Sequence, residues 1–338
     1  MRFTRIPLLT GLVITLMLSG VACSQENQGQ DFPGLQLELQ TIIDEAEAGQ
    51  MGNLHSLLVY GQGELLAEQY FQGYDQDSLH YQYSVTKSVA SILIGIAIDQ
   101  GFINSVEDKV YDYFPEYGGN FANWTDAKAK MTLQDVLTMS AGFSWDEWTY
   151  IYTDERNDAN KLIRSNDLIK YMLDLPLSSE PGSRWTYNSG CSILLSGIIQ
   201  NASGMSTEEF AKAYLFDKLS ITDWHWEQGK DGVYNTGWGL HLLPADMLKI
   251  GRMVLDSGQW EGEQVVSATW LQESSTNHIN SYGYQWWLSD GFFSARGWGG
   301  PVIGVIPEKE LVVVTTAGDF SNGVGPTDIR IINRLARY

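Results

Sequence analysis

The sequence predicts an α+β fold in which one antiparallel sheet, flanked by helices, is built from both ends of the chain around an all-helical insert. Two groups of residues support the sheet: a glycine-punctuated stretch near residues 56–71 and two apolar runs after residue 301. The third observation concerns residues 102–236, where capped segments with helical spacing alternate with long aromatic loops.

The first element along the chain is a targeting segment, residues 1–23. A short basic start, MRFTR, precedes the apolar run IPLLTGLVITLML and the small residues before Cys23. This run is too short for a membrane span and is typical of a signal peptide. A small-residue box that ends in cysteine is similar to a bacterial lipoprotein signal, although Gly20 stands where leucine is usual. Ordinary secretory cleavage nearby is the alternative.

Residues 24–34 are polar and predict a flexible tether after Cys23. With Cys23 lipidated, we expect an exported, periplasmic protein that touches a bacterial membrane only through this anchor. Cys191 is the second of the two cysteines and lies in an apolar run. No disulfide is then expected within the chain, and the core alone must stabilise the fold.

Residues 35–101 and 237–338 together predict the α/β domain. Helical spacing covers residues 35–49, and LHSLLVYGQGELLAEQYF predicts a hairpin with strands near 56–60 and 64–71. A helix follows from about Ser84 to Gly101. After residue 237 the clearest strands are VIGVIP and ELVVVTTA, and the amphipathic segment TDIRIINRLARY closes the chain.

Residues 102–236 predict a mostly helical domain. The segments MTLQDVLTMSAGF and STEEFAKAYLFDKL each begin with a threonine or serine cap ahead of apolar residues at helical spacing. We therefore expect the insert between the two parts of the sheet to be all-helical.

Charge and residue spacing exclude several classes of function. The 338 residues carry a formal net charge of −20, which argues against a nucleic-acid partner because phosphate contacts need lysine and arginine. The five histidines show no metal-ligand spacing. No Gly-rich phosphate loop is present, and no Gly-x-Ser-x-Gly elbow supports a Ser-His-Asp hydrolase. We therefore expect neither a metal nor another cofactor.

A serine and a lysine stand three residues apart where the helix near Ser84 begins. The ordinary interpretation is a helix cap followed by a solvated charge. On a helix, however, this spacing places Ser84 and Lys87 on one face, beside the free N–H groups of the helix N-terminus. A serine hydroxyl there becomes nucleophilic when a neighbouring base accepts its proton. Lysine serves only if burial lowers its pKa or its charge lowers the pKa of a second base.

Tyr187 is the candidate for this second base. It lies in a turn rich in Gly, Ser and Asn, within EPGSRWTYNSGCSILLSGIIQ, directly before an apolar helix. A tyrosine in such a turn more often only packs its ring, so the local sequence leaves both interpretations open. The case for Tyr187 therefore depends on the motifs around it.

Several ordered motifs resemble those of the serine hydrolases of the class C β-lactamase and penicillin-binding-protein superfamily. The resemblance is greatest to the branch of esterases and 6-aminohexanoate-dimer hydrolases, and it covers about residues 50–335. SVTK (84–87) is similar to the nucleophile motif, and YNS (187–189) to the Tyr-x-Asn motif, with serine in place of asparagine. ARGWGGPVIGVIPEKELVVV places the third motif at WGG (298–300), where β-lactamases have Lys-Thr-Gly.

The resemblance implies acyl-enzyme chemistry without a cofactor. Ser84 would attack an ester or amide carbonyl, and Lys87 with Tyr187 would form the acid–base pair. The charge of Lys87 would have to lower the pKa of Tyr187 for the phenolate to act. One oxyanion donor would be the Ser84 N–H. The strand of the third motif would supply the second, from among Trp298, Gly299 and Gly300.

The expected substrate is a small ester or amide. The loop GFSWDEWTYIYTDE would wall the cleft with aromatic rings, which suits an uncharged or cationic acyl group. The residues expected to contact it are Ser189, Trp145, Trp148, Tyr150 and Arg296.

Alternatives to this substrate class remain at this point. D-amino-acid peptides and weak β-lactam hydrolysis compete within the enzyme hypothesis. Loss of the third-motif cation at Trp298 argues against β-lactamase activity as the main role, because that cation would hold a substrate carboxylate. The alternative from another class is a non-catalytic envelope protein that binds cell-wall peptides or a partner.

Overall fold

The computed structural model describes residue 1 and residues 33–320 and 326–338, and the residues from 33 onward form one compact unit. The expected signal peptide, Cys23 and the tether up to residue 32 lie outside the described residues. Helix α1 (Pro33–Glu47) begins before the expected end of the tether at residue 34. Proline explains this boundary, because its fixed φ and missing N–H suit the first turn of a helix.

A six-stranded antiparallel sheet with the order β2-β1-β11-β10-β9-β8 joins the two ends of the chain. The N-terminal hairpin β1–β2 attaches to the C-terminal strands through β11, with Leu58 opposite Val314. This arrangement confirms the predicted α+β fold with a sheet built from both ends. The strands are β1 (Leu54–Gly61), β2 (Glu64–Tyr70), β8 (Trp287–Ser289), β9 (Phe292–Arg296), β10 (Val302–Ile306) and β11 (Leu311–Ala317).

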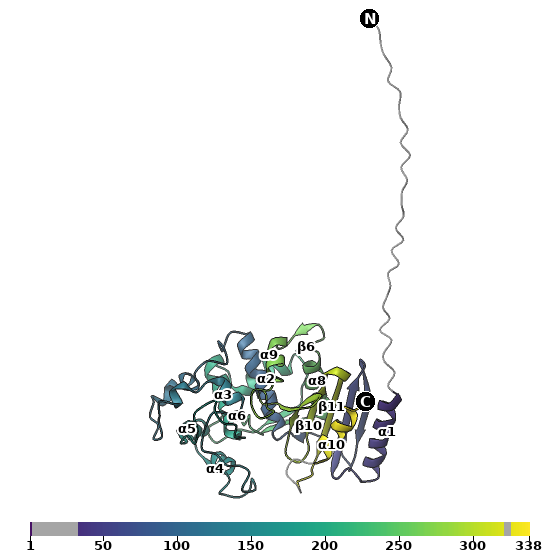
Figure 1. Ribbon diagram of the computed structural model, residues 1–338, viewed down its shortest axis with the longest axis horizontal. Coiled ribbons are helices and arrows are strands. Elements are labelled where there is room, and N and C mark those ends of the chain that lie inside the picture. The colour runs from purple at the N-terminus through teal and green to yellow at the C-terminus, as the bar shows by residue number, and fades with distance from the viewer. Residues whose placement is uncertain (2–32, 321–325) are drawn as a thin grey trace. The chain divides into compact units, whose positions relative to one another are not determined.

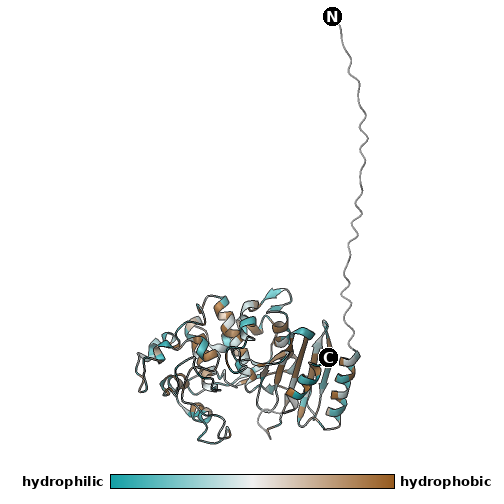
Figure 2. Cartoon of the chain, in the orientation of Figure 1, coloured by the Kyte–Doolittle hydropathy of each residue, from teal (hydrophilic) through white to brown (hydrophobic). Residues whose placement is uncertain are grey.

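Both faces of the central strands are buried, which explains their continuous apolar sequences. Leu57 and Val59 of β1 pack with α1 and α10 (Pro326–Leu335) on one face, whereas Leu58 joins the larger core on the other. Figure 1 shows α1 and α10 beside the sheet and α3 to α6 away from it. Strands β10 and β11 are correspondingly brown in the hydropathy colouring of Figure 2.

Helices supply most of the remaining regular structure, and two of them begin at predicted caps. Thr132 with Asp135, and Ser206 with Glu209, form capping boxes. The helices between the two parts of the sheet are α2 (Val85–Asp99), α3 (Leu133–Leu137), α4 (Asp158–Arg164), α5 (Leu168–Asp174), α6 (Ser189–Ser203), α7 (Thr207–Ala211), α8 (Pro244–Leu255) and α9 (Ala268–Ser274).

The insert is not all-helical, which corrects one detail of the prediction. Strand β4 (Trp224–Trp226) pairs with β5 (Leu240–Leu242), and β5 pairs with β3 (His80–Tyr81). Strands of two or three residues are too short to show an alternating pattern. This small sheet connects the insert to the residues directly before Ser84. A further hairpin comprises β6 (Gln259–Trp260) and β7 (Glu263–Gln264).

Across the described residues, no helix combines the length and the apolar character that crossing a bilayer requires.

Candidate active site

Ser84 lies at the N-terminus of α2, in the N-cap position, and its side chain makes no capping hydrogen bond. The hydroxyl is therefore not occupied by the role that an ordinary helix cap would give it. Tyr83 directly before it has a φ of 44°, in the left-handed region that non-glycine residues seldom adopt. Backbone strain of this kind is often found at functional sites.

Lys87 points from the first turn of α2 toward Ser84. Its Nζ atom donates hydrogen bonds to Ser84 Oγ at 3.0 Å and to the carbonyl of Gly237 at 2.6 Å. The side chain is only 1% exposed. Burial lowers the pKa of Lys87 to about 8, while the negative charge of Glu147 acts in the opposite direction. The amine is thus closer to neutrality near physiological pH than an ordinary lysine.

Tyr187 lies in the turn directly before α6, whose N-cap is Asn188. From there its side chain approaches Ser84 and Lys87. Its side chain hydrogen-bonds with Ser84, and Lys87 Nζ lies 5.0 Å from the centre of its ring. The structure therefore brings the three residues together. Burial and then the charge of Glu147 raise the pKa of Tyr187 well above its usual value of 10.0, although the hydrogen bond with Ser84 lowers it. The expected lowering of the Tyr187 pKa was wrong.

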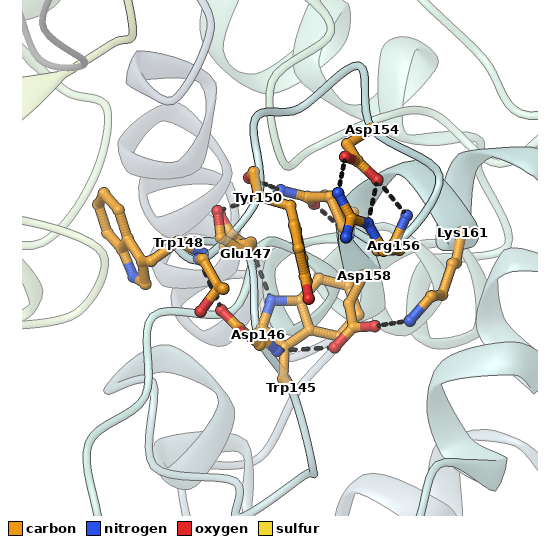
Figure 3. Close-up of polar contacts among 12 residues, drawn as sticks. Trp145, Asp146, Glu147, Trp148, Tyr150, Asp154, Arg156, Asp158 and Lys161 are labelled. Carbon is orange, nitrogen blue, oxygen red and sulfur yellow. Dashed lines mark hydrogen bonds and ion pairs between the residues drawn. The ribbon is translucent and has the colours of Figure 1, made fainter.

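Glu147 is the residue of this site that the sequence analysis missed. Its side chain is 2% exposed, and both carboxylate oxygens accept hydrogen bonds. Oε2 accepts from Trp145 Nε1 at 2.7 Å and from the Ser189 N–H at 2.8 Å. Figure 3 shows the Trp145 indole directed at Glu147. The stretch WDEW holds two acidic residues between two tryptophans, and since Asp146 is exposed while Glu147 is buried, the local sequence does not tell them apart.

The third motif lies in the turn between β9 and β10 rather than on a strand, which corrects its predicted placement. Gly299 and Gly300 have φ values of 87° and 109°, which end the strand geometry after Arg296. A Cβ atom on Gly297 would lie 2.4 Å from the carbonyl oxygen of Gln82. Glycine at 297 therefore lets this turn approach the backbone next to the nucleophile.

Two pockets meet at Ser84, with empty volumes of about 610 and 970 Å³ including space open to solvent. The first, the tyrosine pocket, is lined by Tyr81, Tyr83, Ser84, Tyr152, Ala159, Asn160, Ile163, Ser189, Trp238 and Trp298. The second, the loop pocket, is lined by Ser84, Glu147, Trp148, Thr149, Tyr150, Ile151, Tyr152, Tyr187, Trp287, Arg296, Gly297, Trp298 and Phe320. The two pockets therefore share Ser84, together with Tyr152 and Trp298.

The structure separates the residues expected to contact substrate. Trp148, Tyr150 and Arg296 line the loop pocket. Ser189 lines the tyrosine pocket, but its hydroxyl donates to Glu147 Oε1 at 2.8 Å. Trp145 does not belong with them, because it is 8% exposed and packs in the main core. Its indole nitrogen supports Glu147 instead of facing the cleft.

Trp298 is the member of the third motif that borders the site. It lines both pockets, and its ring centre lies 5.5 Å from those of Tyr83 and Tyr152. Gly299 and Gly300 pack instead against Phe320 and Ala317. Within the described residues, no three His, Cys, Asp or Glu side chains gather as metal ligands.

A serine at a helix N-terminus, with a buried lysine one turn later and a buried tyrosine, is an arrangement that can activate a serine hydroxyl as a nucleophile. A family model described as Beta-lactamase matches residues 39–337. The chain belongs to this beta-lactamase family, whose members are serine hydrolases. The match confirms the predicted superfamily and the predicted enzyme class.

Individual relatives agree with the predicted branch. The chain is 26% identical over 280 residues to the 6-aminohexanoate-dimer hydrolase of Paenarthrobacter ureafaciens, covering 77% of this chain and 71% of that protein. It is 25% identical to the lovastatin esterase of Penicillium rubens, over 44% of this chain and 39% of that protein.

A solved structure shows the same fold. The 6-aminohexanoate-dimer hydrolase homologue from Bacillus anthracis superposes with a TM-score of 0.70 at 18% identity, covering 85% of this chain and 79% of that chain.

Proposed function

We propose that this protein hydrolyses small esters or amides through an acyl-enzyme on Ser84, with Lys87 and Tyr187 moving the protons. The observation that carries the proposal is the 3.0 Å hydrogen bond from buried Lys87 Nζ to Ser84 Oγ. A lysine buried beside a hydroxyl is a base in its neutral form, because burial disfavours its charge.

Lys87 is assigned the first proton transfer. In its neutral form it accepts the proton of Ser84 as Oγ attacks the carbonyl carbon, and the tetrahedral intermediate forms. Tyr187 is a poor initial base, because its pKa lies far above neutral. A neutral phenol in hydrogen-bond contact with Ser84 is suited to the opposite task. It relays a proton from Lys87 to the leaving group, and the pair then activates water for deacylation.

The oxyanion of the intermediate needs two N–H donors. Ser84 N–H, at the start of α2, is assigned as the first. In the β9–β10 turn, Gly297 N–H donates to the carbonyl of Pro301 and Gly300 N–H to that of Gly297. Because Trp298 borders both pockets and Gly299 borders neither, we assign the second donor to the Trp298 N–H.

The two pockets orient the substrate on Ser84. Tyr187, the proton donor to the leaving group, lines only the loop pocket. The leaving group therefore occupies the loop pocket, and the acyl chain extends into the tyrosine pocket. Among the described residues, no Asp, Glu, Lys or Arg lines the tyrosine pocket, which favours an uncharged acyl chain. Arg296 adds a positive charge to the loop pocket and favours a polar leaving group.

The relatives differ in what their names state, a dimer hydrolase in one case and an esterase in the other. Both activities follow from one acyl-enzyme scheme, since only the leaving atom changes. We propose small esters and linear amides as substrates, with D-amino-acid peptides next. β-Lactams rank last, because Trp298 stands in place of the third-motif cation. Export with a lipid on Cys23 remains part of this proposal and places the reaction in the periplasm.

A fluorophosphonate probe tests the nucleophile directly. We expect wild type to be labelled on Ser84 and to turn over p-nitrophenyl esters faster than nitrocefin or D-alanyl peptides. Ser84→Ala should lose labelling and ~10³-fold or more of the turnover, because the covalent intermediate cannot form. Circular dichroism provides the control for folding. A folded wild type that takes up no probe would instead favour the non-catalytic envelope protein.

A further inference from the structure

Glu147 has all the hydrogen bonds that a buried carboxylate requires, yet no lysine or arginine forms an ion pair with it among the described residues. Four donors converge on its two oxygens. The Trp145 indole and the Ser189 N–H donate to Oε2, and the Ser189 and Tyr152 hydroxyls donate to Oε1 at 2.8 and 3.1 Å. Four such bonds compensate the cost of burying the carboxylate where no partner charge is present.

These contacts fasten the aromatic loop, residues 145–152, to α6. Ser189 is the first residue of α6 and comes two residues after Tyr187. The Glu147 carboxylate that it binds therefore lies at the positive end of the helix dipole. Further hydrogen bonds fix the shape of the loop. Asp146 Oδ1 accepts from the N–H groups of Trp148 and Thr149 at 3.0 Å. Asn157 Nδ2 donates to the carbonyl of Tyr150 at 2.7 Å. Figure 3 shows Asp146 and Tyr150 of this loop near Glu147, with the Trp148 ring turned away from them.

The charge of Glu147 acts on every titratable group that faces it. It opposes the burial-driven fall in the pKa of Lys87 and adds to the burial-driven rise in that of Tyr187. The other groups in its field are phenols and one thiol. Burial raises their pKa values and the charge of Glu147 adds to the rise for Tyr152 in the loop, Cys191 in α6 and Tyr282 before β8. In each case the charge of Glu147 favours the protonated form of the group.

We propose that Glu147 is a positioning residue that fixes the aromatic loop against the N-terminus of α6 and that its negative charge acts on the proton-transfer pair Lys87 and Tyr187. This inference rests on the proposed function and extends it. Glu147 holds Tyr187 as an acid for the leaving group, and in return it confines the neutral, basic form of Lys87 to higher pH.

Glu147→Gln separates the charge from the shape. The glutamine amide keeps the same length. Its oxygen can accept from the Ser189 N–H and Trp145, while its NH₂ group faces the two hydroxyls, which can rotate to accept. We expect the acid limb of kcat/KM for a p-nitrophenyl ester to move down by about one pH unit, because one buried charge has been removed from the field of Lys87. The rate of fluorophosphonate labelling should show the same displacement without a contribution from deacylation.

A purely structural role predicts a different result. Loosening the loop would lower the rate at all pH values and leave the limb in place, which is the result expected of Ser189→Ala because Glu147 keeps its charge there. An unmoved limb in labelled, folded Glu147→Gln overturns the electrostatic role alone. Failure of wild type to take up the probe would instead overturn the proposed function.

Glu147→Asp keeps the experiment decisive if Glu147→Gln does not fold. Aspartate retains the charge but is one methylene shorter, so it cannot reach all four donors. We expect KM to rise through a looser loop, with the acid limb unmoved. If the acid limb of kcat/KM in Glu147→Asp moves down as far as is expected for Glu147→Gln, the charge at position 147 does not set the position of the limb.

Discussion

Two lysines of this protein are buried to the same extent but sit in different surroundings. Lys87 and Lys128 are 1% and 0% exposed, and each donates to a backbone carbonyl, at 2.6 Å to Gly237 and 2.8 Å to Leu173. Burial lowers the pKa of each to about 8. A perturbed lysine is therefore not by itself the mark of this site.

The difference lies in the second contact of each amine. Lys87 Nζ also donates to Ser84 Oγ and lies over the ring of Tyr187, and Ser84 lines both pockets. Lys128 Nζ lies 6.0 Å from the ring centre of Phe143, and Lys128 lines neither pocket. Burial lowers the pKa of the amine in both places, but a serine hydroxyl lies within hydrogen-bond reach of Lys87 alone among the two.

Paired substitutions should give the largest effect in this comparison. Lys87→Met is expected to lower kcat/KM for a p-nitrophenyl ester by ~10³-fold, because the general base is lost. Lys128→Met removes an equally buried amine and should leave kcat/KM within about twofold, as expected of a distant, independent site. Steady-state kinetics at one pH measures both. Comparable losses in the two variants would break the distinction between the lysines.

Lys128 should instead affect how the free energy of unfolding depends on pH. Its folded pKa of about 8 lies below the unfolded value of 10.5, so between these values the unfolded chain binds more protons and the free energy of unfolding rises with pH. Below about pH 8 the full cost of burying the charge is present. Replacing Lys128 with methionine should therefore flatten this rise by about 3 kcal/mol in total between pH 8 and 10.5. Urea denaturation across this range measures the slope, and an unchanged slope would contradict the assignment.

The lysine comparison also shows what can be predicted from the sequence. Ser84 and Lys87 are one helical turn apart, so local spacing was enough to bring them together. Strands β10 and β11 were also predictable from local sequence, because their residues are almost continuously apolar. Lys128 gave no sign of burial, since its environment depends on the carbonyl of Leu173, 45 residues away.

Glu147 was missed because its contacts are also long-range. Its contact with Ser189 spans 42 residues and involves a loop without periodicity. Strand β4 was too short to leave a pattern, and the turn at Gly299 and Gly300 depends on two positive φ angles that motif matching does not reveal. Tyr187 was placed by the family motif. The direction of its pKa shift required the buried surroundings that only the coordinates supply.

The smallest expected effect comes from the two carboxylates whose charges act on these lysines, Glu147 on Lys87 and Asp174 on Lys128. Burial lowers the pKa of both lysines, and the charge of Glu147 opposes this fall at Lys87 as that of Asp174 does at Lys128. If the acid limb of kcat/KM belongs to Lys87, it should lie near pH 8 in wild type, with activity rising as the pH rises through it. Asp174→Asn should then leave the limb in place, whereas Glu147→Gln moves it down. Each variant removes one charge, so the net charge of the chain changes equally in both. A limb that follows Asp174 would mean that the titrating base is not Lys87 and that general surface electrostatics set the profile.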